Sequence, residues 1–221
     1  DSERSTIVNP NEVIQLLLFI RGTTLHHSRI SNEHKDALNI LLDALRLTIP
    51  KFQIHDFKLY NYSYIELRIL LLLSVLVAED ENYEIEISTK ILYFILERLS
   101  INSTSRYIDP LIVKIYSNLA YNYHIQDNQK KVIEISNIGI AYCLDHETIH
   151  SLFLLYYRKG IAEYKLDQKN YLESLYYSFF MLKMTNQQDL LDVYLEVTRQ
   201  KYNIDVPILS LDLITHSQIQ K

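Results

Sequence analysis

Residues 115–142 read IYSNLAYNYHIQDNQKKVIEISNIGIAY, and this stretch decides how the chain folds. Apolar residues recur at three- and four-residue spacing on both sides of the polar break Gln126-Asp127-Asn128. That spacing is typical of amphipathic helices, and the break is typical of a tight turn. The stretch therefore predicts two helices joined by a short turn, and its polar face raises the question of a ligand.

The composition of the whole chain favours helices over sheets. Of the 221 residues, 48% are hydrophobic and 22% are charged, as in a globular protein. The chain contains only 3 Gly and 4 Pro, whereas phosphate-binding loops, dinucleotide fingerprints and sheets with many tight turns all require glycine. We therefore expect an all-α protein without a cofactor.

Charge and cysteine content limit the partners and the compartment. The formal net charge is −5 and no Lys/Arg run stands out, so we expect no nucleic-acid binding by this chain alone. The sole cysteine, Cys143, excludes an intramolecular disulfide and favours a cytoplasmic protein. The longest apolar run, residues 69–78, covers about half of the roughly 20 residues that cross a bilayer, so we expect a buried helix and no membrane contact.

Helical periodicity continues along the chain. It predicts helices at about 11–29, 31–48, 60–78, 83–99, 109–124, 129–143, 145–166, 171–184 and 187–202, with a loop over 51–58. We expect residues 1–10 to be a linker from a missing N-terminal region and residues 11–203 to form a helical repeat domain. Residues 204–221 are expected to form a C-terminal capping segment.

Two of the predicted helix pairs repeat the same pattern. Asn118-Leu119-Ala120-x-x-Tyr123 precedes one polar turn, and Lys159-Gly160-Ile161-Ala162-x-Tyr164 precedes the next. Ala120 and Gly160 lie 40 residues apart, and a small residue is required where two helix backbones approach closely. Repeats of this length, built from helix pairs, predict an α-solenoid with a concave groove.

The first of these patterns resembles a tetratricopeptide repeat. Over residues 60–205, the stretches YSNLAYNYHIQDNQKKVIEISNIGIAYC and YYRKGIAEYKLDQKNYLESL resemble the C-terminal repeat domain of Rgg/PlcR-type (RNPP) regulators of Gram-positive bacteria. The resemblance implies a quorum-sensing transcription regulator in the cytoplasm. Its concave groove would bind a short signalling peptide and change either the homodimer or the DNA affinity of an N-terminal helix-turn-helix domain, which this chain lacks.

Mapping the repeat onto the sequence gives a candidate peptide-binding face. In the first pair the face carries Lys114, Ser117, Asn118, Tyr121 and His124, and in the second pair it carries Leu154, Tyr157, Arg158, Ile161 and Tyr164. The amide of Asn118 could pair with a peptide main chain, and Arg158 could hold a carboxylate. Tyr121, Tyr157 and Tyr164 could form apolar walls. Asn118 could instead satisfy helix ends or face water, and Arg158 could form a solvated or inter-repeat ion pair.

One motif raises the possibility of an enzyme. His146-Glu147-Thr148-Ile149-His150 fits the H-E-x-x-H pattern, in which two imidazoles one helical turn apart bind zinc. We interpret it as the solvated first turn of a helix, with Glu147 at the positive end of the helix dipole. We therefore expect no catalytic residues, no metal and no enzymatic activity. The alternative to a peptide sensor is a tetratricopeptide-type scaffold that docks a protein partner and has no small ligand.

Overall fold

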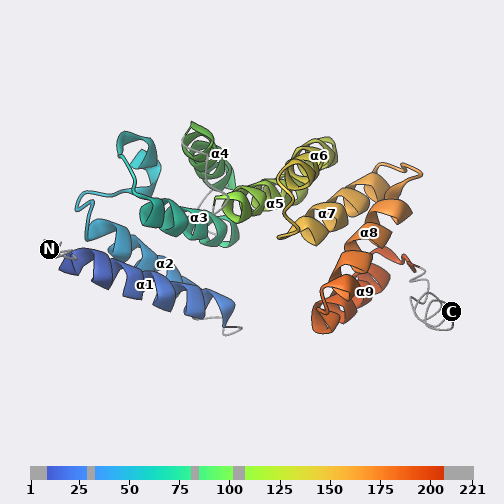
Figure 1. Cartoon of the computed structure of the whole chain (residues 1–221), viewed down its shortest axis with the longest axis horizontal. Coiled ribbons are helices and arrows are strands. Elements are labelled where there is room, and N and C mark those ends of the chain that lie inside the picture. The colour runs from blue at the N-terminus through green and yellow to red at the C-terminus, as the bar shows by residue number, and fades with distance from the viewer. Residues whose placement is uncertain (1–8, 29–32, 81–84, 102–107, 207–221) are drawn as a thin grey trace, which may run out of the picture. The chain divides into compact units, whose positions relative to one another are not determined.

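The computed structural model describes residues 9–28, 33–80, 85–101 and 108–206, and all regular secondary structure in these ranges is helical (Figure 1). Within each of the chain's two compact units, successive α-helices pack side by side, which confirms the predicted all-α class and its helix hairpins. The contacts divide the chain into two compact units, Asp1–Thr104 and Ser105–Lys221. In the described part, no helix combines the length and the apolarity needed to cross a bilayer.

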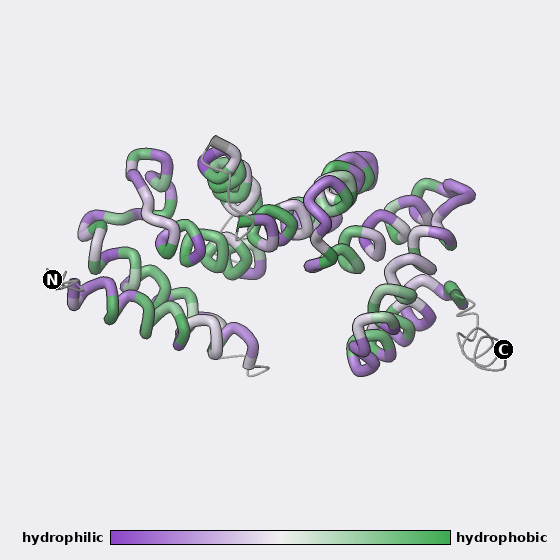
Figure 2. Tube along the Cα trace, viewed as in Figure 1, coloured by the Kyte–Doolittle hydropathy of each residue, from purple (hydrophilic) through white to green (hydrophobic). Residues whose placement is uncertain are grey.

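The first unit contains α1 (Pro10–His27), α2 (Glu33–Arg46), a 3-10 helix η1 (Ile54–Leu59), α3 (Tyr64–Glu79) and α4 (Ile85–Ile101). Helix α3 packs against both α2 and α4 and is apolar on most sides, as its colouring in Figure 2 shows. The side chain of Asn9 accepts a hydrogen bond from the backbone of Asn11, so Asn9-Pro10 begins α1 as the sequence predicts.

A buried chain of polar groups joins the first three helices. The Gln15 amide donates to the carbonyl oxygen of Ala44 and to Oγ1 of Thr48, both at 2.9 Å. Thr48 in turn donates to the Glu66 carboxylate, which also closes the capping box at Ser63. Buried polar groups are costly unless they are hydrogen-bonded, so this network fixes how α1, α2 and α3 align.

The second unit contains α5 (Asp109–Ile125), α6 (Gln129–Asp145), α7 (Leu152–Lys165), α8 (Tyr171–Met184) and α9 (Gln188–Tyr202). Each helix packs against the next, and α5 also contacts α7 across the intervening helix. Helices α5 and α7 are the first members of successive pairs. Their direct contact is the stacking that defines an α-solenoid.

The helices of the second unit end with the same backbone conformation, a residue with positive φ. Asp127, Glu147, Asp167, Asn186 and Asn203 each follow a helix and have φ between 52° and 56°. Glycine usually occupies this left-handed position because it lacks a Cβ, and Asn and Asp tolerate it better than most residues. Asp127 and Asp167 lie 40 residues apart, so the turns repeat with the same period as the helices.

Two predicted boundaries are wrong. Residues 54–59 of the expected loop form η1, and the seventh helix begins at Leu152 instead of following an Asp145 cap. Asp145 is the last residue of α6, and Glu147 and Ser151 both have positive φ, so the chain turns twice before α7 begins. Asp109 lies inside α5, with Ile108 at the cap position.

The C-terminal segment is described only at its start. Ile204 is buried against Leu175, Phe179 and Leu191. The expected docking of residues 208–214 and the expected cap at Ser31 lie outside the described residues, as does most of the linker predicted for residues 1–10.

Gly160 marks the closest approach of α7 and α8. A Cβ placed on Gly160 would lie 2.8 Å from Cγ of Leu175 and 3.1 Å from its backbone nitrogen. The second contact involves backbone, which cannot move away as a side-chain tip can. The small residue that the repeat predicts at position 160 is therefore required by helix packing.

Replacing Gly160 with Ala should destabilise the protein. The overpacked contact costs about 1–3 kcal/mol, and the better helix propensity of Ala returns about 1 kcal/mol at most. We expect a net loss of about 1–2 kcal/mol in the free energy of unfolding, measured by urea denaturation. Asn137→Ala, at an exposed position of α6, is the control and should be neutral or slightly stabilising. An equally stable Gly160→Ala protein would contradict the close contact.

Candidate functional site

A hollow of about 340 Å³ lies between α5, α7 and α9, and we call it the Arg158 hollow. It is lined by Tyr121, His124, Ile125, Leu154, Tyr157, Arg158, Ile161, Tyr194, Val197, Lys201 and Tyr202. Six residues of the face predicted from the sequence are among them: Tyr121, His124, Leu154, Tyr157, Arg158 and Ile161. The structure thus brings together side chains from the first helices of successive pairs.

Tyrosine rings span the space between α7 and α9. The centroids of the Tyr157 and Tyr194 rings are 4.6 Å apart, and the Tyr157 hydroxyl lies 3.3 Å from Oγ1 of Thr198. Burial raises the pKa of Tyr157 to about 12, so its hydroxyl stays neutral at physiological pH. These large rings keep the two helices apart and form the apolar walls of the hollow.

The charge of Arg158 has no counterion in the hollow. Its guanidinium carbon lies 4.8 Å from the centroid of the Tyr121 ring, within cation–π range. Its Nε is shielded from solvent, and among the described residues neither a hydrogen bond nor a carboxylate satisfies it. Burial lowers the pKa of Arg158, and the nearby rings of Tyr194, Tyr121 and Tyr157 act in the opposite direction.

The other ionisable groups strengthen the positive potential. Lys201 lines the hollow, whereas no Asp or Glu does. Burial lowers the pKa of His124 below its ordinary value of 6.5, and the positive charges of Lys165, Arg158 and Lys201 lower it further. His124 is therefore neutral at pH 7, and its buried Nδ1 has no hydrogen-bond partner among the described groups. An anion entering the hollow would meet positive charge and the unsatisfied Nε–H of Arg158.

The remaining predicted site residues lie elsewhere. Lys114 is exposed, Ser117 is buried and Asn118 is partly buried, and none of these three lines the Arg158 hollow. Tyr164 packs against the Tyr171 ring at 5.2 Å, and its hydroxyl donates to the backbone oxygen of Tyr202 at 3.1 Å. Tyr164 therefore helps to hold the wall in place without facing the hollow.

Four lining residues come from α9, and the sequence analysis did not predict them: Tyr194, Val197, Lys201 and Tyr202. A signal for three of these four was present. Tyr194, Val197 and Lys201 lie 40 residues after Leu154, Tyr157 and Ile161, so one further step of the repeat would have found them. Tyr202 falls outside that period.

The H-E-x-x-H motif does not have the geometry of a zinc site. Residues 146–151 form the connection between α6 and α7, so the predicted helical turn that would align the two imidazoles is absent there. The Nδ1 of His146 lies 3.1 Å from Oδ1 of Asp109, and its ring stacks on Tyr142 at 3.9 Å. His150 lies beside a different hollow. The described residues include no group of three or more His, Cys, Asp or Glu side chains placed to hold a metal.

Comparisons with known proteins give little further information. No family model and no curated protein matches the chain. Among solved structures, the chain is similar to Bacillus thuringiensis PlcR, crystallised in complex with the peptide PapR7 and DNA. The match covers 82% of this chain and 71% of that chain, with 15% identity and a TM-score of 0.49. Similarity at this level carries no argument about the function of this protein.

His124 and His150 should each show, by a change in pKa, the removal of one neighbouring cation. Arg158→Met removes a positive charge that disfavours the imidazolium of His124, so the pKa of His124 should rise. Lys114→Met should raise the pKa of His150 in the same way and leave His124 unchanged. NMR titration of the histidine ring signals measures both pKa values. If the pKa of His124 is the same in Arg158→Met as in the original protein, the two side chains are not close to each other.

Proposed function

We propose that the Ser105–Lys221 unit is the sensor domain of a transcription regulator and binds a short signalling peptide in the Arg158 hollow. One observation carries the proposal: the Nε of Arg158 is shielded from solvent and has no hydrogen-bond partner among the described residues, in a hollow that no Asp or Glu lines. Buried charges in proteins are normally paired, because an unpaired one loses its hydration without compensation. A ligand carboxylate would supply the missing partner.

The peptide carboxylate would bind between Arg158 and Lys201. A guanidinium can donate two parallel hydrogen bonds to a carboxylate, and Lys201 would add a second positive charge. Tyr121, Tyr157 and Tyr194 would contact apolar atoms of the peptide's last residue. The volume of about 340 Å³ is at the lower end of the range for ligand sites, which fits one end of a peptide better than a whole one.

Binding would affect the helical stack because the hollow is built from three helices. A ligand that contacts α5, α7 and α9 together favours the spacing of those helices in the bound form. The free energy available to change the helix spacing equals the difference between the ligand's binding free energies for the bound and the free arrangement of the helices. A homodimer, a cytoplasmic location and control of a DNA-binding domain outside this chain belong to the same proposal and rest on the resemblance in residues 60–205.

A protein-docking scaffold is the second candidate, and one observation favours it. Helix α1 exposes five large apolar side chains on neighbouring turns, with exposed fractions from 44% to 60%: Val13, Ile14, Leu16, Leu17 and Ile20. Exposed apolar side chains at this spacing are typical of a helix that meets a partner. This face belongs to the first unit, so the scaffold function would not depend on Arg158.

Peptide selection distinguishes the two candidates. A library of random octapeptides with free carboxyl termini is passed over the immobilised protein, and retained peptides are identified by mass spectrometry. Arg158→Met should weaken the best of them at least tenfold, because a charge-assisted hydrogen bond contributes about 1.5–3 kcal/mol. Amidation of the C-termini of the same peptides should weaken their binding by a similar factor.

The control for this experiment is Lys114→Met, which removes an exposed cation of α5 that does not line the hollow. It should leave the affinities within twofold of the original protein. Asn118→Ala tests the main-chain role predicted for Asn118 in the same assay. If no peptide is retained, or if Arg158→Met and amidation both leave retention unchanged, the sensor proposal is wrong and the scaffold is favoured.

A further inference from the structure

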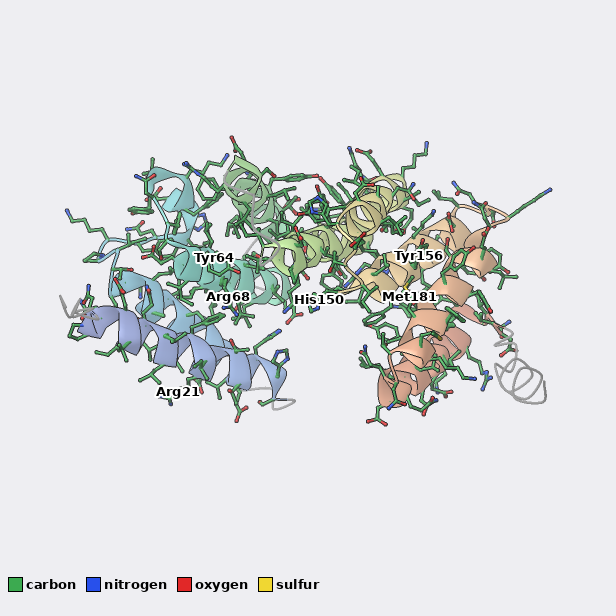
Figure 3. All side chains as sticks on the ribbon, in the orientation of Figure 1. Arg21, Tyr64, Arg68, His150, Tyr156 and Met181 are labelled. Atoms are coloured by element: carbon green, nitrogen blue, oxygen red, sulfur yellow. The ribbon has the colours of Figure 1, made fainter. Side chains whose placement is uncertain are left out.

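A second hollow, of about 400 Å³, lies where α7 begins, α8 ends and the chain enters α9. We call it the methionine hollow. It is lined by Ile149, His150, Ser151, Phe153, Met181, Met184, Thr185 and Gln187. Two of these residues, His150 and Met181, are labelled in Figure 3 near the N-terminal end of α7. Neither the repeat pattern nor the proposed carboxylate site uses this hollow.

The lining favours an uncharged apolar group. No Asp, Glu, Lys or Arg lines the hollow. Burial and the charge of Lys114 lower the pKa of His150, which is therefore neutral at pH 7. Met184 and Ile149 are 63% and 69% exposed, an unusual loss of burial for large apolar side chains. Methionine is flexible and polarisable, so it adapts to apolar groups of different shape.

The methionine hollow and the Arg158 hollow are separate cavities that border one row of packed aromatic rings. Phe153 and Tyr157 lie one turn apart on α7, and their ring centroids are 5.8 Å and 4.6 Å from that of Tyr194. Phe153 lines the methionine hollow, whereas Tyr157 and Tyr194 line the Arg158 hollow. One aromatic wall therefore borders both sites on the same face of α7.

The spacing of Phe153 and Arg158 along α7 fits an extended peptide. Residues 153 and 158 are separated by roughly 7–8 Å along the helix axis, at about 1.5 Å per residue. An extended chain advances about 3.3 Å per residue, so about two residues span this distance. A peptide whose C-terminus lies at Arg158 would thus place an earlier side chain at Phe153.

We propose that the methionine hollow binds an apolar side chain of the signalling peptide, about two to three residues before its C-terminal carboxylate. This inference rests on the proposed peptide-binding function. It adds a specificity requirement: the ligand carries a Leu, Ile, Met or Phe side chain at a fixed distance from the end that Arg158 holds. Peptides with a charged or very small residue at that position bind more weakly.

The two methionines are natural reporters of this hollow. The chain contains only 2 Met, and both line it. Protein labelled with ¹³C at the methionine methyl groups should give two signals, assigned with Met184→Leu. Both should shift progressively with N-acetyl-leucinamide, which carries no charge, and remain in place with N-acetylglycinamide at the same concentration. Equal shifts with both compounds, or none with either, would overturn the hollow as an apolar site.

The peptide library then tests the link between the two hollows. Retained peptides should be enriched in apolar residues two or three positions before the carboxyl terminus. Met184→Glu should abolish this enrichment and weaken the best peptides about tenfold. Leu144→Glu is the matched control, because Leu144 is 65% exposed at the end of α6 and lines neither hollow, and it should change affinity less than twofold. Circular dichroism melting confirms that both variants are folded.

The results of these experiments distinguish a failure of the second subsite from a failure of the proposed peptide-binding function. Peptides that depend on Arg158 but show no apolar preference at a fixed position, or that bind Met184→Glu unchanged, overturn the second subsite and leave the carboxylate site standing. If the retained peptides bind Arg158→Met as tightly as the original protein, the proposed function and the inference that rests on it are both wrong. In that case the shift of the methionine signals with N-acetyl-leucinamide would still identify an apolar hollow, without a link to Arg158.

Discussion

The contact of the half-buried Arg158, whose Nε is shielded from solvent, with the Tyr121 ring is the interaction on which the site depends. Arg158 loses hydration, gains a cation–π contact with Tyr121 and has no carboxylate partner in the described structure. The cation–π contact is worth about 0.5–2 kcal/mol, which is much less than the hydration energy of an isolated buried cation. Under the proposed function an anion pairs with Arg158, and the positive side chains of Lys201 and Lys165 near His124 add to the positive potential there.

The spacing of the helices explains why a hollow exists at this place. Helices α7 and α8 approach closely at Gly160, which has no side chain to separate them. Helices α7 and α9 instead face each other through Phe153, Tyr157 and Tyr194. A close contact on one side and aromatic spacers on the other leave room between α5, α7 and α9. Side-chain size thus decides both where the stack is closed and where it is open.

Much of the fold could be predicted from the sequence because its signals are local. Hydrophobic spacing located the helices, and the 40-residue repeat related Ala120 to Gly160 and the turn at Asp127 to that at Asp167. The wrong start of the seventh helix has a local cause. Helix ends here use Asp, Glu and Asn in left-handed conformation, so the glycine that commonly marks a helix end was missing. The turn at Glu147 was therefore read as the start of a helix.

The sequence by itself determined the helical class, the pairing of neighbouring helices and the face of α7 that carries Tyr157 and Arg158, since each depends on residues within one or two turns. Only the tertiary structure decided which polar side chains share a site. It joined Arg158 to Tyr194 and Lys201, left Asn118 outside the hollow, and paired His146 with Asp109. These contacts join residues from different helices, and their distances are set by how closely large and small side chains allow the helices to pack.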